Sequence, residues 1–199
     1  MSASHQSIYE VFEHQKTELL FHLLGSLPDF NQVMVFIRTR DDVHALTSEL
    51  NRAGVTVESF HGSKKPELRD RALKAFGEGV IRVIVTTEAA ARSIDLSGVK
   101  NVINFDAHEL DPDYLQRVEI VEKSGGEVIT LVTPQAPQLA SKLDALAGAE
   151  LPRKTADEFA YATQAIYVRP SRKKGGTSKG LHSKPLQNKK PKYKTKRSR

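Results

Sequence analysis

The stretch from Ser59 to Leu96 reads SFHGSKKPELRDRALKAFGEGVIRVIVTTEAAARSIDL and decides the fold of this chain. It holds the end of a predicted strand, a helix beginning at Pro66, a second strand at 80–85 and a short Ala-rich helix after Thr87. This alternation with short connections is typical of a parallel sheet. Polar and basic residues stand where the strands end, at the edge where open α/β sheets bind ligands.

The flanking sequence continues the alternation. Apolar runs bounded by turn residues predict strands at 32–38, 55–60, 80–85, 99–105 and 127–132. Apolar residues at helical spacing predict helices at 15–24, between Thr39 and Gly54, and at 66–76, 88–92 and 134–146. The residues before 15 are expected only to lead into the first helix, and no structure is predicted after Pro152. We expect an α/β domain in three layers, with a mostly parallel sheet between helices.

Composition narrows the class of protein. The 199 residues include no Cys, which excludes disulfides and thiolate metal sites and suits a reducing compartment. No apolar run reaches the roughly 18 residues of a membrane span, and the N-terminus lacks the pattern of a secretory signal. We therefore expect a cytoplasmic protein with no membrane partner.

Charge is distributed unevenly along the chain. Residues 169–199 contain 13 Lys or Arg and no acidic residue, so 17 basic and 24 acidic residues remain in 1–168, a net charge of −7 there. The Lys, Gly, Ser and Pro of 169–199 predict a disordered tail, because they bury too little apolar surface to offset the entropy of ordering. Such a tail binds polyanions by neutralising phosphates. The alternative is a solubility tail without a specific partner.

Motifs of a self-sufficient enzyme are absent from the sequence. It contains no phosphate loop ending in Gly-Lys-Ser or Gly-Lys-Thr, no acidic strand end to hold Mg²⁺, no HExxH and no GxSxG. We therefore predict no catalytic residue and no metal site. The features that remain favour binding: Gly62 permits close approach of a ligand, Arg69 lies early in a helix, and Thr87 begins one, where phosphates bind. Taken singly, each also fits a turn glycine, a surface charge or a helix cap.

Five blocks, in order and at matching spacing, resemble the C-terminal RecA-like domain of DEAD-box RNA helicases. They are QSIYEVFEHQKTELLFHLL, VMVFIRTR (motif IV), FHGSKKPELRDRALKAF (motif IVa), VIVTTEAAARSIDL (motif V) and DYLQRVEIVEKSGGEVITLV (motif VI and a strand). The resemblance implies a RecA-like domain over 1–153, a C-terminal extension over 154–168 and a Lys/Arg-rich tail over 169–199. Such tails are appended to several bacterial members.

The resemblance also implies two sets of site residues. The RNA sugar-phosphate backbone would contact Thr39, Arg40, Gly62, Arg69 and Thr87. A vestigial nucleotide site would contain Arg92, Asp95, Arg117 and Lys123, with Asp95 reaching the ribose and Arg92 organising the loop between the sites. No cofactor would be required, and ATP would bind weakly if at all.

Departures from the family pattern concentrate on the nucleotide side. Motif VI usually reads HRxGRTGR, whereas residues 116–123 read QRVEIVEK, so the two finger arginines fall at Ile120 and Lys123. Motif V has Glu88 for Asp and Ser93 for Gly, and motif IVa has Pro66 for Gln. No first RecA lobe is present in the sequence. We therefore expect a stand-alone lobe that binds RNA without hydrolysing ATP.

Two alternatives remain open. The chain could complete an ATPase with a first lobe encoded elsewhere, acting as half of an RNA helicase. It could also be a protein-binding scaffold that docks on a ribonucleoprotein assembly through the face that once met the other lobe.

Overall fold

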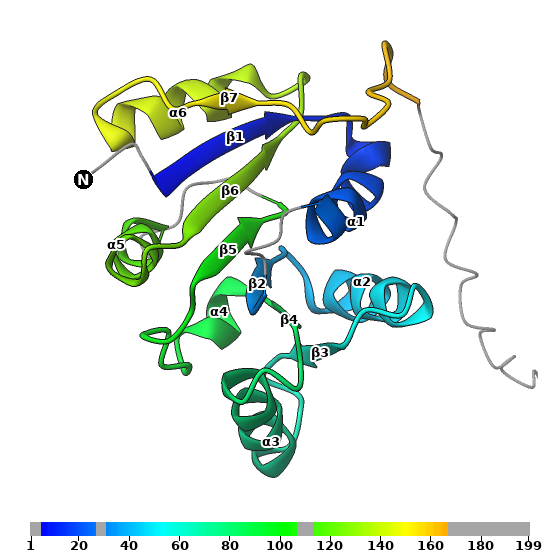
Figure 1. Ribbon diagram of the computed structural model, residues 1–199, viewed down its shortest axis with the longest axis vertical. Helices are drawn as coiled ribbons and strands as arrows, with labels where there is room; N and C mark the ends of the chain where they lie inside the picture. Colours follow the sequence, from blue (N-terminus) through cyan, green and yellow to red (C-terminus); the bar gives the residue numbers. More distant parts are fainter. Residues whose placement is uncertain (1–4, 27–30, 107–113, 167–199) are drawn as a thin grey trace, which may run out of the picture. The chain divides into compact units, whose positions relative to one another are not determined.

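A computed structural model describes residues 5–26, 31–106 and 114–166 as a parallel sheet flanked by helices (Figure 1). Its strands are β1 (Gln6–Glu10), β2 (Val33–Phe36), β3 (Val57–Phe60), β4 (Val83–Thr86), β5 (Asn101–Asn104), β6 (Glu127–Val132) and β7 (Arg153–Lys154). Its helices are η2 (Glu13–Gln15), a 3-10 turn, and α1 (Lys16–Ser26), α2 (Arg40–Arg52), α3 (Pro66–Gly77), α4 (Glu88–Ala91), α5 (Tyr114–Ser124) and α6 (Pro137–Ala147).

The seven strands form one sheet in the order β3-β4-β2-β5-β6-β1-β7, and every neighbouring pair is parallel. The five strands predicted from apolar runs correspond to β2 through β6. The α/β class and the parallel sheet are thus confirmed. A parallel arrangement brings the carboxyl ends of all these strands to one edge, which is where the candidate site lies.

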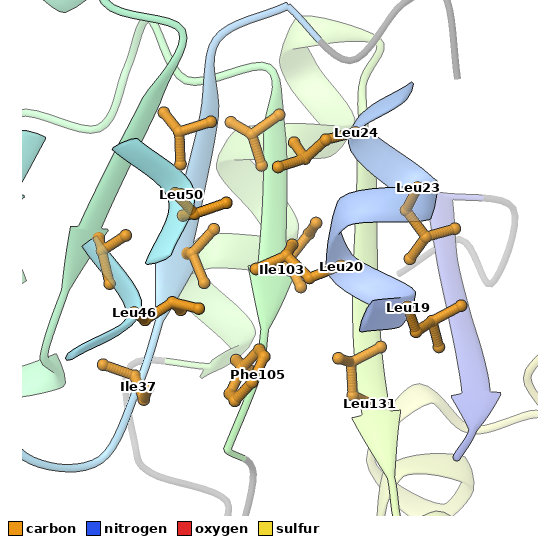
Figure 2. Packing of buried hydrophobic residues seen from close by; sticks show 14 of the residues in the cluster. Leu19, Leu20, Leu23, Leu24, Ile37, Leu46, Leu50, Ile103, Phe105 and Leu131 are labelled. Atoms are coloured by element: carbon orange, nitrogen blue, oxygen red, sulfur yellow. The ribbon is translucent and has the colours of Figure 1, made fainter. Parts of the chain in front are cut away.

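Helices cover both faces of the sheet. Helices α1 and α2 lie on one face and α3, α4, α5 and α6 on the other (Figure 1). Strand β2 shows why its sequence is uniformly apolar: Val33 and Val35 pack in the first cluster, while Met34 and Phe36 pack in the second. Figure 2 shows the first cluster, where leucines of α1 and α2 meet Ile103, Phe105 and Leu131 from the sheet. Burial on both faces accounts for the absence of alternation.

The expectation that the residues before the first helix only lead into it is wrong. Residues Gln6–Glu10 form β1, which pairs along its whole length with β6. Two of its polar residues are buried with partners: Gln6 accepts a hydrogen bond from Tyr114 at 2.9 Å, and Ser7 donates to Glu127 at 2.6 Å. The partner strand lies about 120 residues away, so local sequence does not reveal this strand.

The segment after α6 packs on the same domain. Strand β7 pairs with β1, and Phe159 and Tyr161 pack against the cluster of α1 and α2. Gln15 holds this segment by donating to the carbonyl of Ala160 at 2.8 Å and accepting from the amide of Ala162 at 2.7 Å. The chain divides into the units Met1–Tyr167 and Val168–Arg199, and the predicted basic tail lies outside the described residues.

Within the described ranges, no helix combines the length and the apolar character that crossing a membrane requires.

Candidate functional site

Three of the predicted nucleic-acid contacts lie at the ends of neighbouring strands. Thr39 follows β2, Gly62 follows β3 and Thr87 follows β4, and these strands are adjacent in the order β3-β4-β2. Each connection leads directly into a helix. The fold therefore brings Thr39, Gly62 and Thr87 together at the carboxyl edge of the sheet, which we call the strand-end edge.

Thr39 and Arg40 organise the start of α2. The Thr39 hydroxyl caps the helix by accepting from the amide of Asp42 at 3.2 Å, and it donates to the Asp42 carboxylate. Arg40 donates to the hydroxyl of Ser63 at 2.7 Å, which ties the loop containing Gly62 to α2. A side chain at Gly62 would meet no described atom within 4 Å, so open space lies beside the backbone there. That space is compatible with a ligand approaching the main chain.

Arg69 and Thr87 complete the strand-end edge. The Arg69 guanidinium lies 5.8 Å from the centre of the Phe60 ring. Its Nε is buried, and among the described residues no group accepts a hydrogen bond from it. Thr87 caps α4 by accepting from the amide of Ala90 at 3.4 Å. Its hydroxyl therefore has a structural role, whether or not it also meets a ligand.

A cavity of about 250 Å³ opens beside α4 and α5. Its lining comprises Phe36, Glu88, Ala91, Arg92, Ile94, Asp95, Leu96, Ser97, Gln116, Arg117 and Ile120. Three of the predicted nucleotide-side residues, Arg92, Asp95 and Arg117, thus share one cavity. Asp95 accepts from the amide of Ser97 at 2.9 Å, and this hydrogen bond lowers the pKa of the Asp95 carboxyl.

Lys123 lies elsewhere. It is not part of the cavity lining and forms an ion pair with Glu119 at 2.7 Å on the exposed surface of α5. The hydrogen bond from Lys123, together with its charge, lowers the pKa of Glu119. The structure does not bring Lys123 together with the other three predicted residues.

Arg117 is a buried residue with partners on three elements. It forms an ion pair with Glu88 at the start of α4, and it donates to the side chain of Asn104 at 3.4 Å. Its guanidinium lies 4.3 Å from the centre of the Phe36 ring on β2, and its side chain is only 4% exposed. Sequence reasoning placed Arg117 facing a nucleotide and missed these contacts, because its partners lie 13 and 29 residues away.

A second cavity, of about 310 Å³, was not predicted. It lies between α1 and α2 and is lined by Glu13, Thr17, Ile37, Arg38, Asp42, Ala45, Leu46, Glu49, Phe105 and Asp106. Beside it, the ammonium of buried Lys16 pairs with Glu13 at 2.8 Å and Asp106 at 3.2 Å. The two carboxylates that pair with Lys16 are far apart in the sequence, so no sequence motif predicts this cluster.

Known proteins share this architecture. Residues 15–119 match the family described as helicase conserved C-terminal domain. The ATP-dependent RNA helicase SrmB of Escherichia coli is 34% identical over 176 residues, which cover 86% of this chain and 38% of that protein. The crystal structure of E. coli SrmB bound to regulator of ribonuclease activity A has a TM-score of 0.73 at 32% identity, covering 82% of this chain and 98% of that chain. The structure of Dbp5 from S. cerevisiae bound to RNA and ADP BeF3 has a TM-score of 0.69 at 28% identity, covering 79% of this chain and 43% of that chain.

The length of the match is also informative. The chain spans between 32% and 38% of the length of three curated relatives. The matched family covers more than half of the chain and includes the connections after β2, β3 and β4. The chain therefore belongs to the helicase conserved C-terminal domain family, as a RecA-like domain of the DEAD-box RNA helicase type.

Proposed function

We propose that this domain binds the RNA backbone through the strand-end edge and does not hydrolyse ATP by itself. The observation that supports it is the convergence of Thr39, Gly62 and Thr87 at adjacent strand ends, with Arg40 and Arg69 beside them. Relatives named as ATP-dependent RNA helicases, and a related structure bound to RNA, support the choice of RNA as the ligand.

The chemistry of this edge suits phosphates and sugars rather than bases. Hydroxyl groups, main-chain amides beside Gly62 and guanidinium groups donate hydrogen bonds to phosphate oxygens and 2′-hydroxyls. The open space at Gly62 and the guanidinium group of Arg69 provide places for such contacts. We therefore expect RNA binding with little sequence preference, strengthened by the basic tail.

Hydrolysis of ATP is disfavoured by the side chains of the 250 Å³ cavity. Ile120 contributes hydrocarbon surface where the family resemblance predicts a finger arginine, and an aliphatic group cannot stabilise developing negative charge. Arg117 is engaged by Glu88, and Lys123 by Glu119 outside the cavity. In this proposal Arg92 and Asp95 contact a nucleotide only weakly, and RNA binding does not require a bound nucleotide.

A second candidate function is half of a helicase completed by a first lobe from another chain. It is favoured by the cavity that Arg92 and Asp95 share. The SrmB complex with a regulator protein likewise suggests a protein or ribonucleoprotein partner for this fold. Recovery of a lobe containing a phosphate loop with the purified chain would favour this candidate.

RNA affinity can be measured with a labelled single-stranded RNA at several salt concentrations. Arg69→Gln should weaken binding and reduce the salt slope by about 0.7, because one phosphate contact is lost. Lys74→Gln is the matched control, since this exposed lysine lies on the same helix and pairs only weakly with Glu78 at 3.9 Å. A chain lacking 169–199 should keep salt-dependent affinity. If the truncated chain loses all RNA affinity and Arg69→Gln binds RNA as tightly as the wild type, RNA binding belongs to the tail alone.

ATP turnover is the second measurement. We expect none above background for the purified chain. Turnover that persists through purification and disappears in Asp95→Ala would contradict the proposal.

A further inference from the structure

Two histidine rings, those of His44 and His61, pack against each other at the strand-end edge. His61 is the first residue after β3, and His44 lies on α2, just over one turn after the Thr39 cap. Their rings pack edge to face with centroids 4.5 Å apart. His61 is 6% exposed, and neither of its ring nitrogens has a hydrogen-bond partner among the described residues. Buried polar atoms normally have partners, so these two nitrogens are an exception that requires a reason.

The charges around His61 are positive. Arg40 and His44 face it from α2, and Lys64 faces it from the loop after β3. Glu58, on β3 itself, is already engaged by Lys64 at 2.5 Å. Burial, reinforced by these neighbours, lowers the pKa of His61. Among the described residues, the charges that act on His61 therefore provide no counter-charge for a proton on its ring.

We propose that binding of an RNA phosphate at the strand-end edge is coupled to uptake of a proton by His61, the buried member of the His44–His61 pair. This inference rests on the proposed RNA-binding function and extends it to the pair. Two proposed backbone contacts lie near the pair in sequence: Arg40 begins α2, which also contains His44, and Gly62 follows His61 in the loop after β3. A phosphate held there supplies the negative charge that the imidazolium lacks, and a nearby opposite charge favours the protonated form.

The direction of the effect follows from linkage. If the bound phosphate raises the pKa of His61, the complex holds more protons than the free domain, and affinity rises as pH falls. A rise of one pKa unit corresponds to a roughly tenfold gain in affinity between pH values above and below the titration.

The experiment measures RNA affinity of the full chain between about pH 5.5 and about pH 8.5, which brackets ordinary histidine titration, at fixed ionic strength. The wild type should bind roughly tenfold more tightly at the acidic end. His61→Asn should lose most of this dependence while keeping its affinity at high pH. His14→Gln, on the 3-10 turn far from β3 in sequence, is the matched control and should keep the wild-type profile.

His44→Gln guards against a folding defect in the buried variant, because His44 is exposed. It should keep the folded circular dichroism spectrum and shift the pH midpoint upward, since a competing positive charge is removed. Imidazole NMR signals give a direct readout, and the His61 signal should titrate at higher pH with RNA bound. Identical pH profiles for wild type and both variants, or an unmoved His61 titration, would overturn the coupling.

The two proposals can fail separately. If Arg69→Gln weakens binding but the pH profiles coincide, RNA binding at the edge stands and the coupling is wrong. If Arg69→Gln has no effect, the binding function itself is wrong and the coupling falls with it.

Discussion

Replacing Arg117 tests whether this motif VI residue is structural. Arg117→Met keeps a long unbranched side chain but removes the ion pair with Glu88 and the contact 4.3 Å from the Phe36 ring. A desolvated cation–π contact contributes up to about 2 kcal/mol. Breaking a fully buried ion pair costs about 3–5 kcal/mol, but Glu88 stays 33% exposed and retains water. We therefore expect the free energy of unfolding to fall by about 3 kcal/mol.

Urea denaturation followed by circular dichroism is the suitable assay, because the chain contains no Trp. The denaturant slope should be unchanged, so that the shift in midpoint reports stability. The double variant Arg117→Met with Glu88→Gln should lose about 1–2 kcal/mol less than the sum of the single variants, since the two residues share one interaction.

The matched control is Lys123→Met, which breaks the exposed ion pair with Glu119. It should cost less than about 1 kcal/mol, because such pairs are screened by water. The reasoning is refuted if Arg117→Met costs no more than this control, or if the double-variant cycle shows no coupling. Unchanged stability with reduced nucleotide binding would instead make Arg117 a ligand-facing residue.

Two further predictions concern the scaffold. Gly126→Ala should destabilise the domain by about 3 kcal/mol or more. The new Cβ would clash with the backbone carbonyl oxygen of Lys100, and a side-chain rotamer change cannot relieve a clash with backbone. Gly77→Ala, where the Cβ meets nothing within 4 Å, should leave thermal stability unchanged or slightly raised, and equal effects of the two substitutions would contradict this account. Arg153 donates hydrogen bonds to Asp144 at 2.6 and 2.9 Å, and these bonds lower the pKa of the Asp144 carboxyl. The pair therefore stabilises the fold at pH values above the unfolded-state pKa of about 3.9. This stabilisation is lost as pH falls through the lower pKa of the folded state. Asp144→Asn should therefore flatten the acid limb of a stability–pH curve relative to wild type, whereas an unchanged acid limb would show that the pair contributes nothing.

Local sequence was sufficient for the elements whose signals are local. The apolar run of β2 predicts a strand buried on both faces, and the apolar spacing after Thr39 predicts the helix α2; both are present. β1 escaped prediction because its evidence is not local. Gln6 and Ser7 are polar, and only pairing with β6 and bonds to Tyr114 and Glu127 make them part of a buried strand.

The sequence by itself determined the α/β class, the positions of five strands along the chain and the residues at their carboxyl ends, because these follow from periodicity and turn chemistry along the chain. Only the tertiary structure decided which of those residues share a site. It placed Arg92, Asp95 and Arg117 around one cavity, left Lys123 outside it, and gave Arg117 partners from three elements. It also paired His61 with His44, 17 residues apart in sequence. The physical reason is that burial, ion pairing and the presence or absence of a hydrogen-bond partner depend on residues that the sheet brings together. The spacing of residues along the chain does not reveal which residues become neighbours.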